Sequence, residues 1–149
     1  MKILGVGHTG ICVRNIEKSL EFYNGILGFK IIQNPCPLVD DPEEGKALGF
    51  PDHSHRVCML EVKPGQLIEL VEFGAPAPTS KEVAPLNNFG KHHISYLVDD
   101  IEAWVEKFRS LGLEVNSKPL SYETEAGPEW WTIVKDPDGI EIELVQQAG

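Results

Sequence analysis

The chain repeats itself, and this internal repeat constrains its fold more than any other feature. Residues 7–17 match residues 92–102 at a constant offset of 85 positions, so that His8 aligns with His93. Self-similarity of this kind indicates that one supersecondary unit occurs twice. At 149 residues the chain has room for one compact domain built from two such units.

Each copy also ends in the same way. The segment Val62–Val71 in the first half resembles Val134–Val145 in the second, and each contains a turn followed by an apolar stretch. The turns are Pro64–Gly65 and Asp136–Gly139, which supply the proline and the glycine that tight turns favour. Each half is therefore predicted to close with a β-hairpin.

The segment after each repeated histidine predicts a helix. Asn15 and Asp100 are suitable N-cap residues, and Gly28 and Gly112 are suited to the left-handed conformation that ends a helix. Apolar residues recur at helical spacing in both segments: Ile16, Leu20, Tyr23 and Leu27 in the first, and Ile101, Trp104, Val105, Phe108 and Leu111 in the second.

The remaining pattern predicts three strands per half and two long loops. The strands are expected at 29–34, 55–63, 66–73, 113–117, 129–135 and 140–146, and the proline-rich loops at 35–53 and 74–90. The fold class is therefore α+β, with two tandem βαβββ modules. Module 1 is expected at about 1–74, a linker at about 75–90 and module 2 at about 91–149.

One face of each half collects metal-ligating side chains. Because side chains alternate along a strand, His8 and Glu69 in the first half, and His93 and Glu143 in the second, lie opposite the apolar residues of their strands. Any one of these residues alone is more commonly an exposed surface residue. The repeated set instead predicts one divalent metal ion, with Zn, Ni, Co, Mn and Fe all compatible with mixed nitrogen and oxygen ligands.

The same blocks resemble the vicinal oxygen chelate superfamily. The motif H-x-G-I-x-V-x-N-I-E with I-E-L-V, and H-I-S-Y-L-V-D-D-I with D-P-D-G-I-E-I-E-L-V, cover nearly the whole chain. This superfamily includes glyoxalase I, methylmalonyl-CoA epimerase, extradiol dioxygenases, and fosfomycin and bleomycin resistance proteins. The resemblance implies a single domain over 1–149 with a cupped mixed sheet around a metal held by His8, Glu69, His93 and Glu143. It also implies a homodimer.

Among these activities, the His/Glu/His/Glu set is most similar to bacterial glyoxalase I. That resemblance implies a lyase or isomerase that moves a proton alpha to a metal-bound carbonyl or hydroxyl of a small substrate, such as a thiol hemithioacetal. Glu143 is the first choice of catalytic base and Glu69 the second. Glu69 stands where methylmalonyl-CoA epimerase typically has Gln, and it is an extra ligand for an extradiol dioxygenase. A non-catalytic drug- or metabolite-binding protein of the bleomycin resistance type would normally dispense with the ligands.

Other polar and aromatic residues receive weaker assignments. His53, His55 and Arg56 follow the first loop, where ordinary exposure is expected. Trp130 and Trp131 are adjacent in a strand, so one of them is expected in the core. Cys12 is expected to be a small packed thiol that faces the cup. Glu141 lies on the same strand face as Glu143, two residues away, and could be mistaken for the ligand.

The bulk composition excludes several classes of partner. The formal charge of -10 disfavours nucleic acid and anionic membranes. No apolar run is long enough for a membrane span or a secretory signal, so a cytoplasmic protein is expected. The three cysteines have no CxxC spacing and are expected to be reduced. A small-molecule substrate is the partner that remains.

Overall fold

The computed structural model describes residues 1–50, 52–80 and 82–148. Two compact units, Met1–Lys81 and Glu82–Gly149, divide the chain, and each is described by itself. Residues 51 and 81 of the predicted loops, and residue 149 of the predicted second module, lie outside the described residues. Within the described ranges, no helix is long and apolar enough to cross a membrane.

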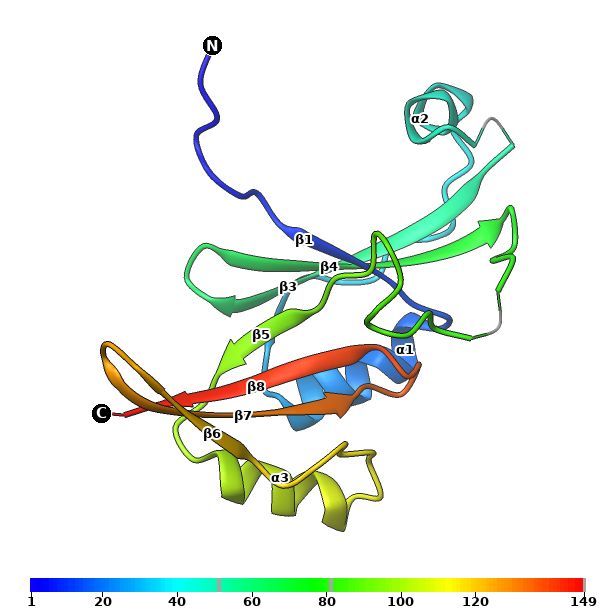
Figure 1. Cartoon of the computed structure of the whole chain (residues 1–149). Coiled ribbons are helices and arrows are strands. Elements are labelled where there is room, and N and C mark those ends of the chain that lie inside the picture. Colours follow the sequence, from blue (N-terminus) through cyan, green and yellow to red (C-terminus); the bar gives the residue numbers. More distant parts are fainter. Residues whose placement is uncertain (51, 81, 149) are drawn as a thin grey trace. The chain divides into compact units, whose positions relative to one another are not determined.

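The first unit is a four-stranded sheet with helices (Figure 1). Its elements are β1 (Thr9–Cys12), α1 (Ile16–Leu20), the π-helix η1 (Glu21–Ile26), β2 (Lys30–Gln33), α2 (Pro42–Leu48), β3 (Ser54–Lys63) and β4 (Gln66–Ala75). The strand order is β1-β4-β3-β2. The first strand is parallel to the last, and the other neighbours are antiparallel.

The second unit repeats this topology. Its elements are β5 (Ile94–Leu97), α3 (Ile101–Ser110), β6 (Leu120–Thr124), β7 (Gly127–Lys135) and β8 (Glu141–Gln147). The strand order is β5-β8-β7-β6, again with the first strand parallel to the last. The predicted α+β class with tandem βαβββ modules is confirmed.

Both predicted helix starts carry the expected caps. The Asn15 carboxamide oxygen accepts a hydrogen bond from the Lys18 N–H at 2.9 Å, and the Asp100 carboxylate accepts one from the Ala103 N–H at 3.0 Å. Gly112 follows α3 with a φ of 74°, so it adopts the left-handed conformation predicted for a helix end. The local signals in the sequence therefore set both helix starts.

The first helix is one residue longer than the second between equivalent positions, and η1 absorbs this residue. The Leu27 N–H donates to the Phe22 carbonyl and the Phe29 N–H to the Tyr23 carbonyl, which are wider spacings than an α-helix uses. A π-turn accommodates one inserted residue without rotating the residues that follow. Tyr23 thus remains fully buried, as its counterpart Phe108 does.

A side chain from the last strand anchors each helix to its sheet. The Ile16 N–H donates to the Glu72 carboxylate at 2.8 Å, and the Ile101 N–H donates to the Gln146 carboxamide oxygen at 2.8 Å. These bonds satisfy backbone donors that every helix start leaves free. The anchors occupy equivalent positions in the two units, although the sequence pattern did not reveal them.

The cores lie between each helix and one face of its sheet. They contain aromatic and branched aliphatic side chains that are almost completely buried: Ile16, Phe22, Tyr23, Leu60 and Leu70 in the first unit, and Ile101, Val105, Phe108, Ile142 and Leu144 in the second. Burial of each such side chain contributes about 1.5–3 kcal/mol to folding. These residues fix which face of each sheet is covered and leave the other face for chemistry.

The strand predicted at 113–117 is wrong in its position. The ladder strand is β6 at Leu120–Thr124, and Val115 forms only an isolated bridge with Val134. The earlier segment does lie along β7, since the Asn116 N–H donates to the Ile133 carbonyl at 2.9 Å. A bend at residues 117–118, just before a proline that has no N–H to donate, interrupts the ladder.

The loop predicted at 35–53 contains a helix. The Asp41 carboxylate accepts from the Glu43 and Glu44 N–H groups, Pro42 occupies the first helical turn, and Gly49 ends the helix with a φ of 79°. Each of these signals is a standard start or stop signal, but the helix is too short to show an apolar period. The second loop prediction, 74–90, differs from the structure only in that β4 continues to Ala75.

The ion-pair cluster of Arg56 predicts a pH dependence of stability. Arg56 donates to both oxygens of Glu17 at 2.7 Å and to Glu72 at 2.7 Å. The hydrogen bond from Arg56 lowers the pKa of Glu17. The pair therefore stabilises the fold above the ordinary carboxyl pKa, and this contribution disappears as the pH falls through the lowered value.

We expect Glu17→Gln to reduce the free energy of unfolding at neutral pH by less than about 1 kcal/mol, because the Glu17 side chain is 57% exposed and solvent screens its charge. The difference from wild type should shrink on acidification. Urea denaturation at several pH values measures it, with Glu21→Gln as the control that removes the same charge one turn later. An undiminished difference at pH 2 would contradict this assignment.

Candidate functional site

In the first unit, one imidazole and one carboxylate meet beside the parallel strand pair. His8 directly precedes β1, and Glu69 lies in β4 opposite Gly10. The His8 Nε2 atom lies 3.3 Å from a Glu69 carboxylate oxygen, and their side chains are 47% and 25% exposed. A Cβ at Gly10 would lie 3.8 Å from the same oxygen, so the glycine leaves space over the carboxylate.

The second unit contains the equivalent pair. His93 directly precedes β5, and Glu143 lies in β8 opposite Ser95. The His93 Nε2 atom lies 3.5 Å from the Glu143 carboxylate, with the side chains 42% and 23% exposed. Each parallel ladder therefore brings together two residues that are distant in the sequence, 61 positions apart in the first unit and 50 in the second.

The strand alternation places each pair away from the covered face. In β4, Ile68 and Leu70 flank Glu69 and are buried, and in β8, Ile142 and Leu144 flank Glu143 in the same way. The histidine and the glutamate of each unit thus lie on the face opposite the helix, as alternation predicts. Binding of one ion by all four residues stays a prediction.

The neighbouring Glu141 forms an ion pair with Lys91. Its carboxylate lies 3.1 Å from the Lys91 ammonium, and both side chains are largely buried, at 12% and 13% exposure. Glu143, in contrast, faces His93. A carboxylate paired with a lysine is a poorer metal ligand than one that faces an imidazole, which supports the choice of Glu143 over Glu141.

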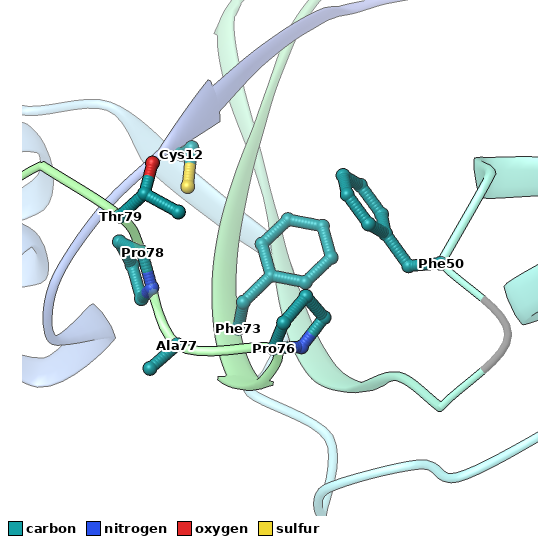
Figure 2. Close-up of a pocket in the computed structure, with 7 residues that line it drawn as sticks. All are labelled: Cys12, Phe50, Phe73, Pro76, Ala77, Pro78 and Thr79. Atoms are coloured by element: carbon teal, nitrogen blue, oxygen red, sulfur yellow. The ribbon is translucent and has the colours of Figure 1, made fainter.

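An apolar cavity of about 230 Å³ opens in the first unit (Figure 2). It is lined by Cys12, Phe50, Phe73, Pro76, Ala77, Pro78 and Thr79. Figure 2 shows the Phe50 side chain turned toward the Phe73 ring, with Cys12 and Thr79 on the other side. The two rings meet edge to face at a centroid distance of 6.0 Å.

This cavity opens on the same sheet face as the His8–Glu69 pair. Cys12 pairs with Val71, and both continue the alternation that carries Gly10 and Glu69. Phe73 lies four residues beyond Glu69 in β4, so its side chain points to that face too. Glu69 and the cavity residue Phe73 therefore lie on one face of the same strand, four residues apart. Small-molecule sites commonly combine an apolar lining with a few polar groups.

The expected exposure of His53 and His55 is wrong. Their relative exposures are 1% and 8%, because α2 lies beside the beginning of β3 and covers them (Figure 1). Arg56 is also engaged, in its ion pairs with Glu17 and Glu72. The sequence did not predict this burial, because residues 35–53 were predicted to form a loop and α2 lies within them.

The tryptophan and cysteine expectations also need correction. Trp130 and Trp131 are both half-buried, so neither belongs to the buried core. Trp131 pairs with Val145 and lies on the face of Glu143. Cys12 faces the cavity as expected, but it is exposed rather than packed.

Residues 5–144 match the Glyoxalase/Bleomycin resistance protein/Dioxygenase superfamily, and the chain therefore belongs to it. The chain is 31% identical over 143 residues to a probable lactoylglutathione lyase of Vibrio cholerae, covering 93% of this chain and 88% of the relative. It is 24% identical over 141 residues to the mitochondrial methylmalonyl-CoA epimerase of Homo sapiens, covering 95% and 73%.

A solved structure of a glyoxalase family protein from Bacillus cereus has the same fold. Its TM-score is 0.85 at 22% sequence identity, and the match covers 100% of this chain and 97% of that one. The family resemblance and the fold predicted from the sequence are thus both confirmed. The relatives of this chain thus include a protein named as a probable lyase and one named as an epimerase.

The exposure of Cys12 at the cavity predicts that its thiol reacts faster than that of Cys58. Cys58 is fully buried, and burial raises the pKa of its thiol. Since the thiolate is the reactive form, iodoacetamide should modify Cys12 at least about tenfold faster than Cys58 in the folded protein. Peptide mass spectrometry over time measures both rates, with Cys12→Ser as the control. Equal rates without unfolding would contradict the placement of Cys12 in the cavity.

Proposed function

We propose that the protein is a metal-dependent lyase or isomerase of the glyoxalase I kind. It would move a proton alpha to a carbonyl of a small oxygenated substrate, such as a thiol hemithioacetal. The observation that carries this proposal is the repeated pair of one imidazole and one carboxylate, set at equivalent registers of the two parallel ladders. The relative named as a probable lactoylglutathione lyase supports it.

The donor atoms of each pair suit one divalent ion. Two ligands that bind the same zinc ion at about 2.0–2.2 Å lie about 3.3 Å apart. The pairs have separations of 3.3 Å and 3.5 Å. His8, Glu69, His93 and Glu143 would together hold the ion, which when bound would polarise a substrate oxygen.

The chain's own residues would handle the proton. Glu143 is the proposed base, because its carboxylate is partly exposed toward the open face and is not paired with a lysine as Glu141 is. Glu69 is the second candidate, and the bare position at Gly10 leaves room beside it. The carboxylate would take the proton from the hemithioacetal carbon and return it to the neighbouring carbon, while the hydroxyl proton moves to the former ketone oxygen. No group is lost in this isomerisation.

The cavity would take the apolar part of the substrate. At about 230 Å³ it is smaller than the roughly 300–1,000 Å³ that drug-sized ligands occupy. Phe50 and Phe73 provide its aromatic surface, and Phe73 lies four residues beyond Glu69 in β4. A small hydrocarbon or thioether group fits this space, and a polar tail would remain outside.

A second candidate reaction is epimerisation of an acyl thioester. The similarity to the human methylmalonyl-CoA epimerase favours it, and it would use the same proton abstraction. Solvent exchange separates the two candidates. An epimerase incorporates deuterium from D2O into an acyl thioester that otherwise changes only its configuration at that carbon. A lyase of the glyoxalase kind instead converts a hemithioacetal into a thioester.

We further propose that the protein is a cytoplasmic homodimer. A four-ligand site needs the His–Glu pair of a first unit and the His–Glu pair of a second unit. Both units can come from one chain, or each can come from a different chain of a dimer. Sedimentation of the purified protein gives the mass. Mixing a chain altered at His8 with a chain altered at His93 restores metal binding only if the site is shared between chains.

Metal content tests the site directly. We expect the protein, purified without a metal-chelating tag, to hold about one divalent ion at these four residues, and His93→Ala with Glu143→Gln to lose it. Elemental mass spectrometry after dialysis gives the stoichiometry. His92→Gln is the control, because His92 is exposed and its ring nitrogen contacts only the Gly90 carbonyl among the described residues.

The catalytic assignment is tested by one conservative change. Glu143→Gln should lower kcat for a methylglyoxal–thiol adduct by about 10²-fold or more, because the amide cannot accept the proton. Glu141→Gln, which alters the lysine-paired neighbour, should retain most of the activity. If Glu141→Gln were the inactive variant, the assignment of the base would be wrong. If no metal binds and no adduct reacts, a ligand-binding protein of the bleomycin resistance type becomes the better account.

A further inference from the structure

A second group of metal-ligating side chains lies in the first unit, apart from the His8–Glu69 pair. Glu44 in α2, His53 before β3 and His55 in β3 place one ligand atom each within 4.8 Å of one another. The His53 Nε2 atom lies 3.9 Å from one Glu44 oxygen, and the His55 Nε2 atom lies 3.6 Å from the other. The two imidazole rings stack at a centroid distance of 5.1 Å.

The burial of His53 calls for a partner beyond those that the described residues supply. Its side chain is 0% exposed, and neither of its ring nitrogens makes a hydrogen bond with any described residue. The Nδ1 atom of His55 is also without a hydrogen bond in that part of the chain. Burying an imidazole with no partner for its polar atoms is unfavourable, and a cation bound to the ring relieves it.

The chemistry of the three side chains selects the kind of ion. Two imidazoles and one carboxylate form the ligand set that late first-row divalent metals prefer. Ligands around zinc lie about 3.3 Å apart, so separations of 3.6 Å and 3.9 Å close by small side-chain rotations. The Glu44 side chain is 45% exposed, which gives an ion a path from solvent.

The backbone holds these ligands in place from two sides. His55 is bonded in both directions to Val39, with N–O distances of 2.8 Å and 3.1 Å, and Asp41 caps the helix that carries Glu44. A preformed site of this kind needs little ordering when it binds an ion. We propose that Glu44, His53 and His55 bind a late first-row divalent cation such as Zn²⁺ in a second site.

This site is placed where it can shape the cavity. The His55 ring lies 5.8 Å from the Phe73 ring, and Phe73 faces Phe50, which directly follows the end of α2 (Figure 2). An ion that joins Glu44 to the two histidines ties α2 to β3 and holds Phe50 against Phe73. The role of this second ion is to fix one wall of the cavity, separate from the proton transfer proposed for Glu143.

The test uses the full chain with one His–Glu pair of the proposed catalytic site altered, His93→Ala with Glu143→Gln, and Zn²⁺ alone as the probe. In this background we expect about one zinc ion per chain after desalting, and an increase in Tm on zinc addition. Adding Glu44→Gln or His55→Gln should abolish both. Glu43→Gln is the matched control, because it removes the same charge from the neighbouring exposed position of α2, where Glu43 pairs with Lys46.

The comparison of Glu44→Gln with Glu43→Gln decides whether the second site exists. Loss of zinc with Glu44→Gln, but not with Glu43→Gln, supports it, provided that circular dichroism shows both variants folded without metal. Equal zinc binding by the two variants would overturn it. If the His93→Ala, Glu143→Gln background binds no zinc while the wild-type protein does, the second site is refuted and the site of the proposed function is supported.

Discussion

The parallel pairing of the first and last strands is the interaction on which the rest of each unit depends. Parallel strands cannot be joined by a tight turn, so a longer connection must lie between them. In each unit this connection contains a helix and two further strands. This pairing places Gly10 opposite Glu69 and Ser95 opposite Glu143. The histidine two residues before each small residue then reaches the carboxylate across the ladder. The βαβββ order and the His–Glu pair are thus two consequences of one ladder.

The two units share a plan but have diverged where function can be specialised. The first has an inserted residue held in η1, a helix between β2 and β3, and an apolar cavity at the end of β4. The second joins β6 to β7 by a short turn in place of such a helix and carries Trp131 on the face of Glu143. Duplication places a His–Glu pair in each unit, and the two copies differ mainly in the segments that connect their strands.

Short-range rules predicted the parts of the fold whose signals are local. The N-caps at Asn15 and Asp100 and the glycine that ends α3 need only neighbouring residues, and all were placed correctly. The strand expected at 113–117 failed because a bend before a proline moved the ladder to β6. The helix α2 was missed because seven residues are too few to show a period. Its absence from the prediction also hid the burial of His53 and His55.

The sequence by itself determined the repeat, the fold class, the superfamily, and which His and Glu residues share a face, since alternation and helical spacing are set by each residue's neighbours. Only the tertiary structure decided that Glu141 is paired with Lys91, that Phe73 and Cys12 line a cavity, and that Glu44 meets His53 and His55. These contacts join residues from separate elements, and their distances depend on how strands and helices pack. A linear pattern carries no record of that packing.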